Sequence, residues 1–105
     1  MIAYLGLFQK GFHGGGREAE PPMQKSLYSR HYKVFLIELR AARTRLGVTQ
    51  QELAARLDAT QSFVSKCERG ERRLDVAELR LWCKALRVPM SDFVSHYEKR
   101  LERSR

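Results

Sequence analysis

The sequence predicts a small all-α protein with one compact five-helix domain behind an N-terminal arm. Three observations predict this fold class: apolar residues recur at helical spacing, helix-capping residues separate the periodic segments, and no segment alternates as a strand does. A length of 105 residues with 43% hydrophobic residues suits a single domain with a modest core. We divide the chain into a flexible extension over residues 1–25, a helical domain over residues 30–101 and a basic tail over residues 102–105.

The N-terminal arm is predicted from its composition. Residues 11–22, GFHGGGREAEPP, hold a glycine triplet and a proline pair, which oppose regular structure. Residues 1–8, MIAYLGLF, are apolar but lack the basic start and the small-residue cleavage site of a secretory signal. No window of the chain approaches the roughly 18 consecutive apolar residues of a membrane span. We therefore expect a disordered arm, no association with a membrane and a cytoplasmic protein.

The first two predicted helices have recognisable ends. An apolar stripe runs over residues 30–46, and Gly47 follows where a left-handed C-terminal cap belongs. Thr49 then precedes Glu52 by three residues, the spacing of a capping box at the start of a second helix. The apolar residues expected to face the core are Phe35, Leu39, Ala42 and Leu46 in the first helix and Leu53, Ala54 and Leu57 in the second.

A tight turn and a third helix follow. Asp58 and Ala59 are expected to form the turn, and Thr60 is expected to cap a helix over residues 60–69. Val64 and Cys67 are three residues apart and should face inward together. The polar side chains left facing outward are Gln61, Ser62, Ser65, Lys66 and Arg69.

The last two helices are also bounded by local signals. Asp75 and Glu78 repeat the capping-box spacing, and Leu74 and Leu79 have the spacing of a hydrophobic staple around it. Pro89 suits the first turn of the fifth helix, where its missing N–H costs nothing. The core faces are expected to hold Val76, Leu79, Cys83 and Leu86, with Trp82 partly buried, and then Phe93, Val94, Tyr97 and Leu101.

The positive charge is confined to the helical part of the chain. The formal net charge is +8, and residues 1–22 balance two basic residues against two acidic ones, so the whole excess lies in residues 23–105. A surface this basic favours a polyanionic partner such as the phosphate backbone of a nucleic acid.

Residues 33–101 resemble the Cro/C1-type helix-turn-helix family, also called the XRE family, of bacterial and phage transcriptional regulators. The resemblance is carried by GVTQQELA at residues 47–54, TQSFVSK at residues 60–66 and ERG at residues 68–70. It implies a lambda repressor-like fold that binds double-stranded DNA and reads the major groove with the helix at about residues 60–69.

The resemblance also implies roles for individual residues. Base edges would be contacted by Gln61, which suits adenine, by Lys66, which suits guanine, and by the permissive Ser62. Phe63 either contacts a thymine methyl group or packs against the second helix. Phosphates would be contacted by Gln50, Thr60, Arg69, Arg72 and Arg73. Arg43 and Glu68 match a structural salt bridge between the first helix and the end of the recognition helix.

Two positions depart from the family pattern. Asp58 stands in the turn before the recognition helix, where glycine is common because the backbone needs a positive φ, which Asp tolerates better than most residues. Arg87 replaces the glycine that often follows the fourth helix, so we expect the chain to approach the fifth helix differently.

The resemblance predicts a sequence-specific transcriptional regulator, most simply a repressor, that binds a near-palindromic operator as a homodimer. Tyr97 and Leu101 are either the dimer contact or part of the monomer core. One alternative function is an antitoxin or adaptor-type module that binds a protein partner and uses DNA for autoregulation. A second alternative is a nonspecific nucleoid-type DNA binder.

Enzymatic and metal-dependent functions have no support in the sequence. No nucleophile, base and oxyanion donor assemble, and no glycine-rich phosphate loop follows a strand, so we expect no enzyme. His13, His31 and His96 share no metal-ligand spacing with Cys67 and Cys83, so we expect no metal and no cofactor. The two cysteines are expected to be inert core residues, with a redox pair as the alternative.

Overall fold

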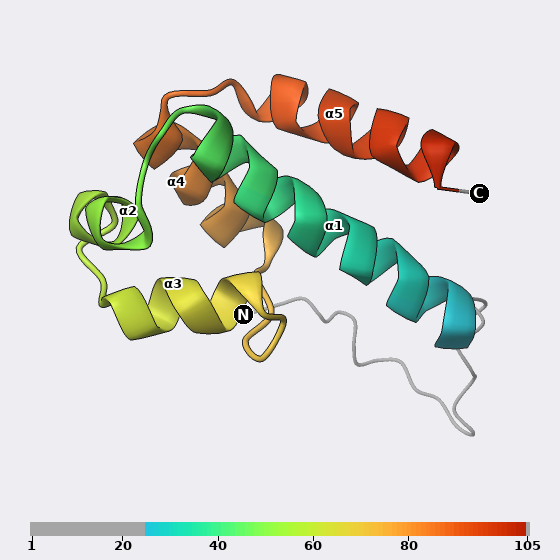
Figure 1. The fold of residues 1–105 in the computed structure, drawn as a ribbon, viewed down its shortest axis with the longest axis horizontal. Coiled ribbons are helices and arrows are strands. Elements are labelled where there is room, and N and C mark those ends of the chain that lie inside the picture. The colour runs from blue at the N-terminus through green and yellow to red at the C-terminus, as the bar shows by residue number, and fades with distance from the viewer. Residues whose placement is uncertain (1–24, 105) are drawn as a thin grey trace.

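The five predicted helices are present. The structure, a computed structural model, describes residues 25–104, and this part of the chain contains no strand. In Figure 1, α1 crosses the centre of the molecule, α5 runs beside it in the opposite direction, and α2 and α3 form a pair at one end. The helices are α1 (Lys25–Arg45), α2 (Gln50–Arg56), α3 (Gln61–Glu68), α4 (Val76–Leu86) and α5 (Met90–Arg103).

Two predicted boundaries are wrong at the ends of the domain. Helix α1 begins at Lys25 rather than at residue 30, because no proline or glycine follows Pro22 to stop the helix from extending. Helix α5 continues through Arg103, so residues 102 and 103 of the predicted tail are helical. The predicted arm otherwise lies outside the described residues.

The predicted capping residues fix the starts of the short helices. Thr49 and Glu52 form a complete capping box, in which Glu52 N donates to Thr49 Oγ1 at 3.0 Å and Thr49 N donates to Glu52 Oε1 at 2.8 Å. Asp75 and Glu78 form a second complete box at the start of α4. Thr60 Oγ1 accepts from Phe63 N at 3.0 Å. Caps matter here because helices of seven or eight residues are not stable in isolation.

The core lies between α1 and the other helices, and most of the predicted inward residues form it. Leu46, Val76 and Val94 are corrections, since they are 49%, 73% and 42% exposed. Leu46 follows the end of α1, Val76 is the first residue of α4, and Val94 is turned away from its buried neighbour Phe93, so none of them reaches the interior. Trp82 is only 1% exposed and is a full core residue. The core cluster comprises Leu39, Ala42, Val48, Leu53, Ala54, Val64, Cys67, Leu79, Trp82, Cys83, Leu86 and Phe93.

Both departures from the family pattern keep the left-handed backbone. Asp58 has φ 55° in the turn between α2 and α3, and Arg87 has φ 63° at the end of α4. The chain therefore leaves α4 with the conformation that a glycine would supply, and the expected difference in its approach to α5 is not seen in this backbone. Gly47 has the predicted positive φ, of 72°.

Gly70, between α3 and α4, allows α1 to approach closely, and this generates a prediction. Its φ is +81°, and an added Cβ would lie 2.8 Å from Leu36 Cδ1. Gly47, with φ +72° and no atom within 4 Å of such a Cβ, is a matched control. We expect Gly47→Ala to lower the free energy of unfolding by about 1–2 kcal/mol for the left-handed backbone alone. Gly70→Ala should lower it by a further ~1–3 kcal/mol because of overpacking. Urea unfolding checks the difference, and equal losses would contradict it.

Candidate nucleic-acid interface

Helix α3 presents one polar face to solvent. Its inner face is fixed by Val64 and Cys67, both fully buried. At 100° per residue, Ser62 and Lys66 lie on the opposite side of the helix and Gln61 lies at the border of that side, and all three are exposed. Figure 1 shows α3 at the edge of the molecule, with one long side that no other helix covers. The arrangement leaves this side accessible to a groove of DNA.

Phe63 lies at the border between the two faces of α3. Its ring is partly buried, with its centroid 6.5 Å from that of Trp82 in α4, and the Arg72 guanidinium lies 5.2 Å from the ring centroid. This geometry supports a packing role for Phe63, with Trp82 of α4 as its aromatic neighbour. Contact with a thymine methyl group stays a prediction.

The structure brings Arg43 and Glu68 together as the resemblance implies. Arg43 Nε donates to Glu68 Oε2 at 2.6 Å and Nη2 donates to Oε1 at 2.9 Å, while Nη1 donates to the carbonyl of Val48 at 2.8 Å. The Glu68 side chain is completely buried and that of Arg43 is 10% exposed. Burial alone raises the pKa of Glu68, but the hydrogen bonds from Arg43 and Gln50, with the charges of Arg43 and Arg40, hold it below its ordinary value.

A chain of hydrogen bonds joins this buried pair to the exposed face of α3. Gln50 Nε2 donates to Glu68 Oε1 at 3.0 Å, and Gln61 Nε2 donates to Gln50 Oε1 at 3.4 Å. Because a carboxylate only accepts hydrogen bonds, the amide of Gln50 must turn its nitrogen inward and its oxygen toward Gln61. The sequence analysis missed this link, since no local pattern connects residues 18 positions apart.

The predicted phosphate-contacting arginines after α3 all have partners within the protein. Arg69 donates from Nε and Nη2 to Glu71 at 2.8 and 3.2 Å, and from Nη1 to Ser65 Oγ. Arg72 Nη1 donates to Glu78 Oε1 at 2.7 Å, and the Arg73 guanidinium lies 4.2 Å from the centroid of the Tyr32 ring. These bonds also lower the pKa values of the two carboxyls: Arg69 lowers that of Glu71, and Arg72 lowers that of Glu78.

A second buried carboxylate, which the sequence analysis did not single out, anchors α5 on the other side of α1. Glu38 is 1% exposed, and its oxygens lie 3.1 Å from Arg100 Nε, 3.3 Å from Arg45 Nη2 and 3.8 Å from His96 Nδ1. Glu38 precedes the predicted core residue Leu39 by one position, which is only a weak sequence signal for burial. A charged side chain at such a position is expected to face solvent.

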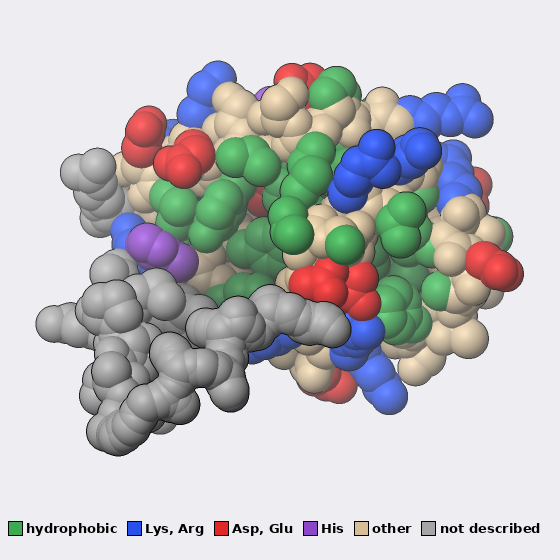
Figure 2. Space-filling model, turned by 180° about the vertical axis from the view of Figure 1, so that it is seen from behind, with side chains coloured by type: hydrophobic (Ala, Val, Ile, Leu, Met, Phe, Trp, Pro, Cys, Tyr) green, Lys and Arg blue, Asp and Glu red, His purple; other side chains and the backbone are tan. Residues whose placement is uncertain are grey.

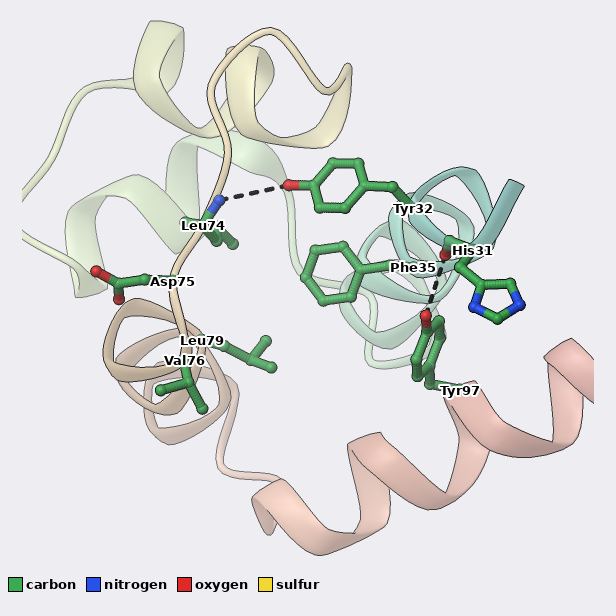
Figure 3. Close-up of a pocket in the computed structure, with 8 residues that line it drawn as sticks. All are labelled: His31, Tyr32, Phe35, Leu74, Asp75, Val76, Leu79 and Tyr97. Atoms are coloured by element: carbon green, nitrogen blue, oxygen red, sulfur yellow. Dashed lines mark hydrogen bonds between the residues drawn. The ribbon is translucent and has the colours of Figure 1, made fainter. Parts of the chain in front are cut away.

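Tyr97 belongs to the packing between α1 and α5. Its hydroxyl donates to the carbonyl of His31 at 3.1 Å, and its ring meets Phe35 edge-on at 6.0 Å. Figure 3 shows both residues at a hollow of about 340 Å³ between α1, α4 and α5, where the Tyr32 hydroxyl also accepts from Leu74 N. Of the two expectations for Tyr97, the structure supports the monomer core.

The remaining chemistry-bearing groups do not form a second kind of site. Within the part of the chain that the structure describes, no three His, Cys, Asp or Glu side chains are grouped to hold a metal. Cys67 and Cys83 are buried free thiols, and burial raises the pKa of both, that of Cys83 to about 11, so both stay protonated at neutral pH. None of the helices over residues 25–104 has the length and apolar character needed to cross a membrane.

The Arg43–Glu68 pair generates a prediction with a matched control. Arg43→Ala leaves the Glu68 carboxylate buried without its bidentate partner, so we expect a loss of about 3–5 kcal/mol in the free energy of unfolding at pH 7. Arg40 lies 3.6 Å from the same carboxylate, but its side chain is 58% exposed, and Arg40→Ala should cost less than ~1 kcal/mol. Chemical unfolding of both variants checks this. If the two variants lost similar amounts of unfolding free energy, the buried bidentate geometry of Arg43 would contribute nothing beyond its charge.

Comparison with known proteins agrees with this architecture. A helix-turn-helix family model matches residues 39–93, more than half of the chain. Searching the curated proteins gives no match.

Solved structures provide closer comparisons. An XRE-family like protein from Pseudomonas syringae pv. tomato str. DC3000 is 43% identical, with a TM-score of 0.66 over 71% of this chain and 92% of that chain. The wild-type restriction-modification controller protein C.Esp1396I is 25% identical, with a TM-score of 0.64 over 68% of this chain and 93% of that one. A mutant of the same controller gives 25% identity, with a TM-score of 0.65 over 69% and 96% of the two chains. The chain therefore belongs to the Cro/C1-type (XRE) helix-turn-helix family, whose members are DNA-binding regulators rather than enzymes.

Proposed function

We propose that this protein is a cytoplasmic, sequence-specific transcriptional repressor that reads the major groove of double-stranded DNA with α3. The observation that carries the proposal is the exposed polar face of α3, formed by Gln61, Ser62 and Lys66 and backed by a fully buried face. The +8 charge of the chain supports attraction to phosphates, which gives affinity, while the side chains of α3 give specificity.

Gln61 is the residue with the best-defined chemistry for reading a base. One N–H of its amide is donated to Gln50 Oε1, which leaves the second N–H and the carbonyl oxygen for a base edge. These two groups match N7 and the N6 amino group of adenine in the major groove. Lys66 would donate to guanine acceptors, and Ser62 would accept several bases.

Gln50 and Thr60 retain groups that suit a phosphate. Gln50 uses one of its two amide hydrogens on Glu68, and Thr60 uses its hydroxyl oxygen as the acceptor for the α3 cap, so each keeps a hydrogen to donate. Arg69 differs from them, because a phosphate at its Nε–Nη2 fork must replace Glu71, which is already bound there.

We propose that two copies bind a near-palindromic operator. Helix α3 has only eight residues, so one copy contacts few base pairs, and a two-fold pair doubles the contacts on half-sites about one DNA turn apart. Two of the similar structures are of a protein titled a restriction-modification controller, and a gene-control role for this chain is consistent with that description.

Selection of bound sites from a random duplex pool at about 150 mM salt tests the reading of bases. We expect an enriched inverted repeat, and expect Gln61→Ala and Lys66→Ala each to lose about 1–3 kcal/mol of discrimination at one position of each half-site. Lys84→Ala removes an exposed lysine on α4, away from α3, and should leave the selected site unchanged. Binding without any enriched sequence would instead support a nonspecific or protein-binding role.

Sedimentation tests the homodimer separately. Tyr97 is engaged with α1, so a contact made by α5 would use its exposed side, where Val94 lies. We expect wild-type protein to sediment as a dimer and Val94→Glu to shift it toward monomer, because a charge buried at an interface is costly. The exposed position of Val94 means that the variant should fold, which circular dichroism checks. A monomeric wild type would contradict the homodimer, and an unchanged mass for Val94→Glu would exclude this side of α5.

A further inference from the structure

The first arginine after α3 uses three of its five N–H donors on neighbours in its own chain. Arg69 presents Nε and Nη2 to the two oxygens of Glu71, and its remaining terminal nitrogen, Nη1, to Ser65 Oγ on α3. Glu71 thus occupies the Nε–Nη2 fork of the guanidinium, one of the edges that can bind a carboxylate or a phosphate in a bidentate manner.

A phosphate and the Glu71 carboxylate therefore compete for the same site. Both offer paired oxygens of matching spacing, so a phosphate gains the fork of Arg69 only after Glu71 leaves it. The side chains of Arg69 and Glu71 are 48% and 55% exposed, and ion pairs this exposed are weak enough to exchange. Until the exchange takes place, Glu71 also repels an approaching phosphate.

The bond from Arg69 to Ser65 connects this exchange to the recognition helix. Ser65 lies on the same side of α3 as Gln61 and Ser62, so the guanidinium is held in place relative to the face proposed to read bases. In the complex proposed above, DNA that receives α3 in its groove would hold a phosphate close to this guanidinium. DNA that binds without α3 in its groove has no phosphate held at this position, and it is repelled by the negative charge of Glu71.

We propose that Glu71 is a specificity-determining residue that masks Arg69 and weakens binding to DNA in which α3 is not seated. The inference rests on the proposed function, since it concerns the same DNA-binding surface. Glu71 gives a clean test of masking, whereas Glu78, the partner of Arg72, also completes the capping box of α4.

Fluorescence anisotropy with a labelled random-sequence duplex of about 20 base pairs, roughly two DNA turns, tests the proposal over a series of salt concentrations. Glu71→Gln should tighten binding by about two- to fivefold, as expected for loss of an exposed competing ion pair. The slope of log K against log salt should steepen by about one phosphate contact. In the Arg69→Ala background, Glu71→Gln should have no such effect, because the masked group is gone.

Two controls separate masking from a general change of charge. Glu98→Gln removes an exposed carboxylate from α5 and should change binding to the same duplex by less than twofold. Against a selected site, Glu71→Gln should improve binding less than it does on the random duplex, which lowers the specificity ratio.

Several outcomes would overturn the proposal. An equal gain from Glu71→Gln in the Arg69→Ala background, or from Glu98→Gln, would show a general effect of charge. Unchanged or weaker binding by Glu71→Gln would show that Glu71 does not mask Arg69. If wild-type protein binds neither duplex at low salt, the proposed function itself fails, a result distinct from normal binding that Glu71 does not affect.

Discussion

The arrangement of the first three helices depends on one buried carboxylate, that of Glu68. An ionised carboxylate without water is costly, and it is tolerated here because Arg43 binds both oxygens and Gln50 donates a third hydrogen bond. Arg43 comes from α1, Gln50 from α2 and Glu68 from α3, so satisfying one charge fixes three helices at once. The additional bond from Arg43 to Val48 places the segment that leads into α2.

This constraint explains how helices of seven and eight residues can present a defined surface. Neither α2 nor α3 is long enough to be stable alone, and their caps fix only where each one starts. Their relative placement comes from the core and from Glu68, and the hydrogen bond that Gln61 donates to Gln50 connects this arrangement to the exposed face of α3. The side chains proposed to touch DNA are therefore partly positioned before any DNA is bound.

Acidic residues have an ordering role throughout this basic protein. Glu38 connects α5 to α1 through Arg100, as Glu68 connects α3 to α1 through Arg43. Glu71 and Glu78 hold two arginines of the exposed loop after α3. Figure 2 shows hydrophobic side chains on the side of the molecule that faces away from the viewer in Figure 1. The net charge of +8 favours binding of polyanions in general. The ion pairs within the protein determine which arginine and lysine side chains remain available to bind them.

The helices, their caps and the inner face of α3 can be predicted from the sequence, because periodicity and capping depend on residues within about four positions of one another. It identified the motif of the family, and with it the exposed residues of α3. It misplaced Leu46 and Val76, whose burial depends on where a helix ends against its neighbours. The partners of Glu38 and Gln50 are known only from the packing of the helices. Arg100 lies 62 positions from Glu38 in the sequence, and Glu68 lies 18 positions from Gln50. Such pairings are set by packing in three dimensions, which local patterns do not encode.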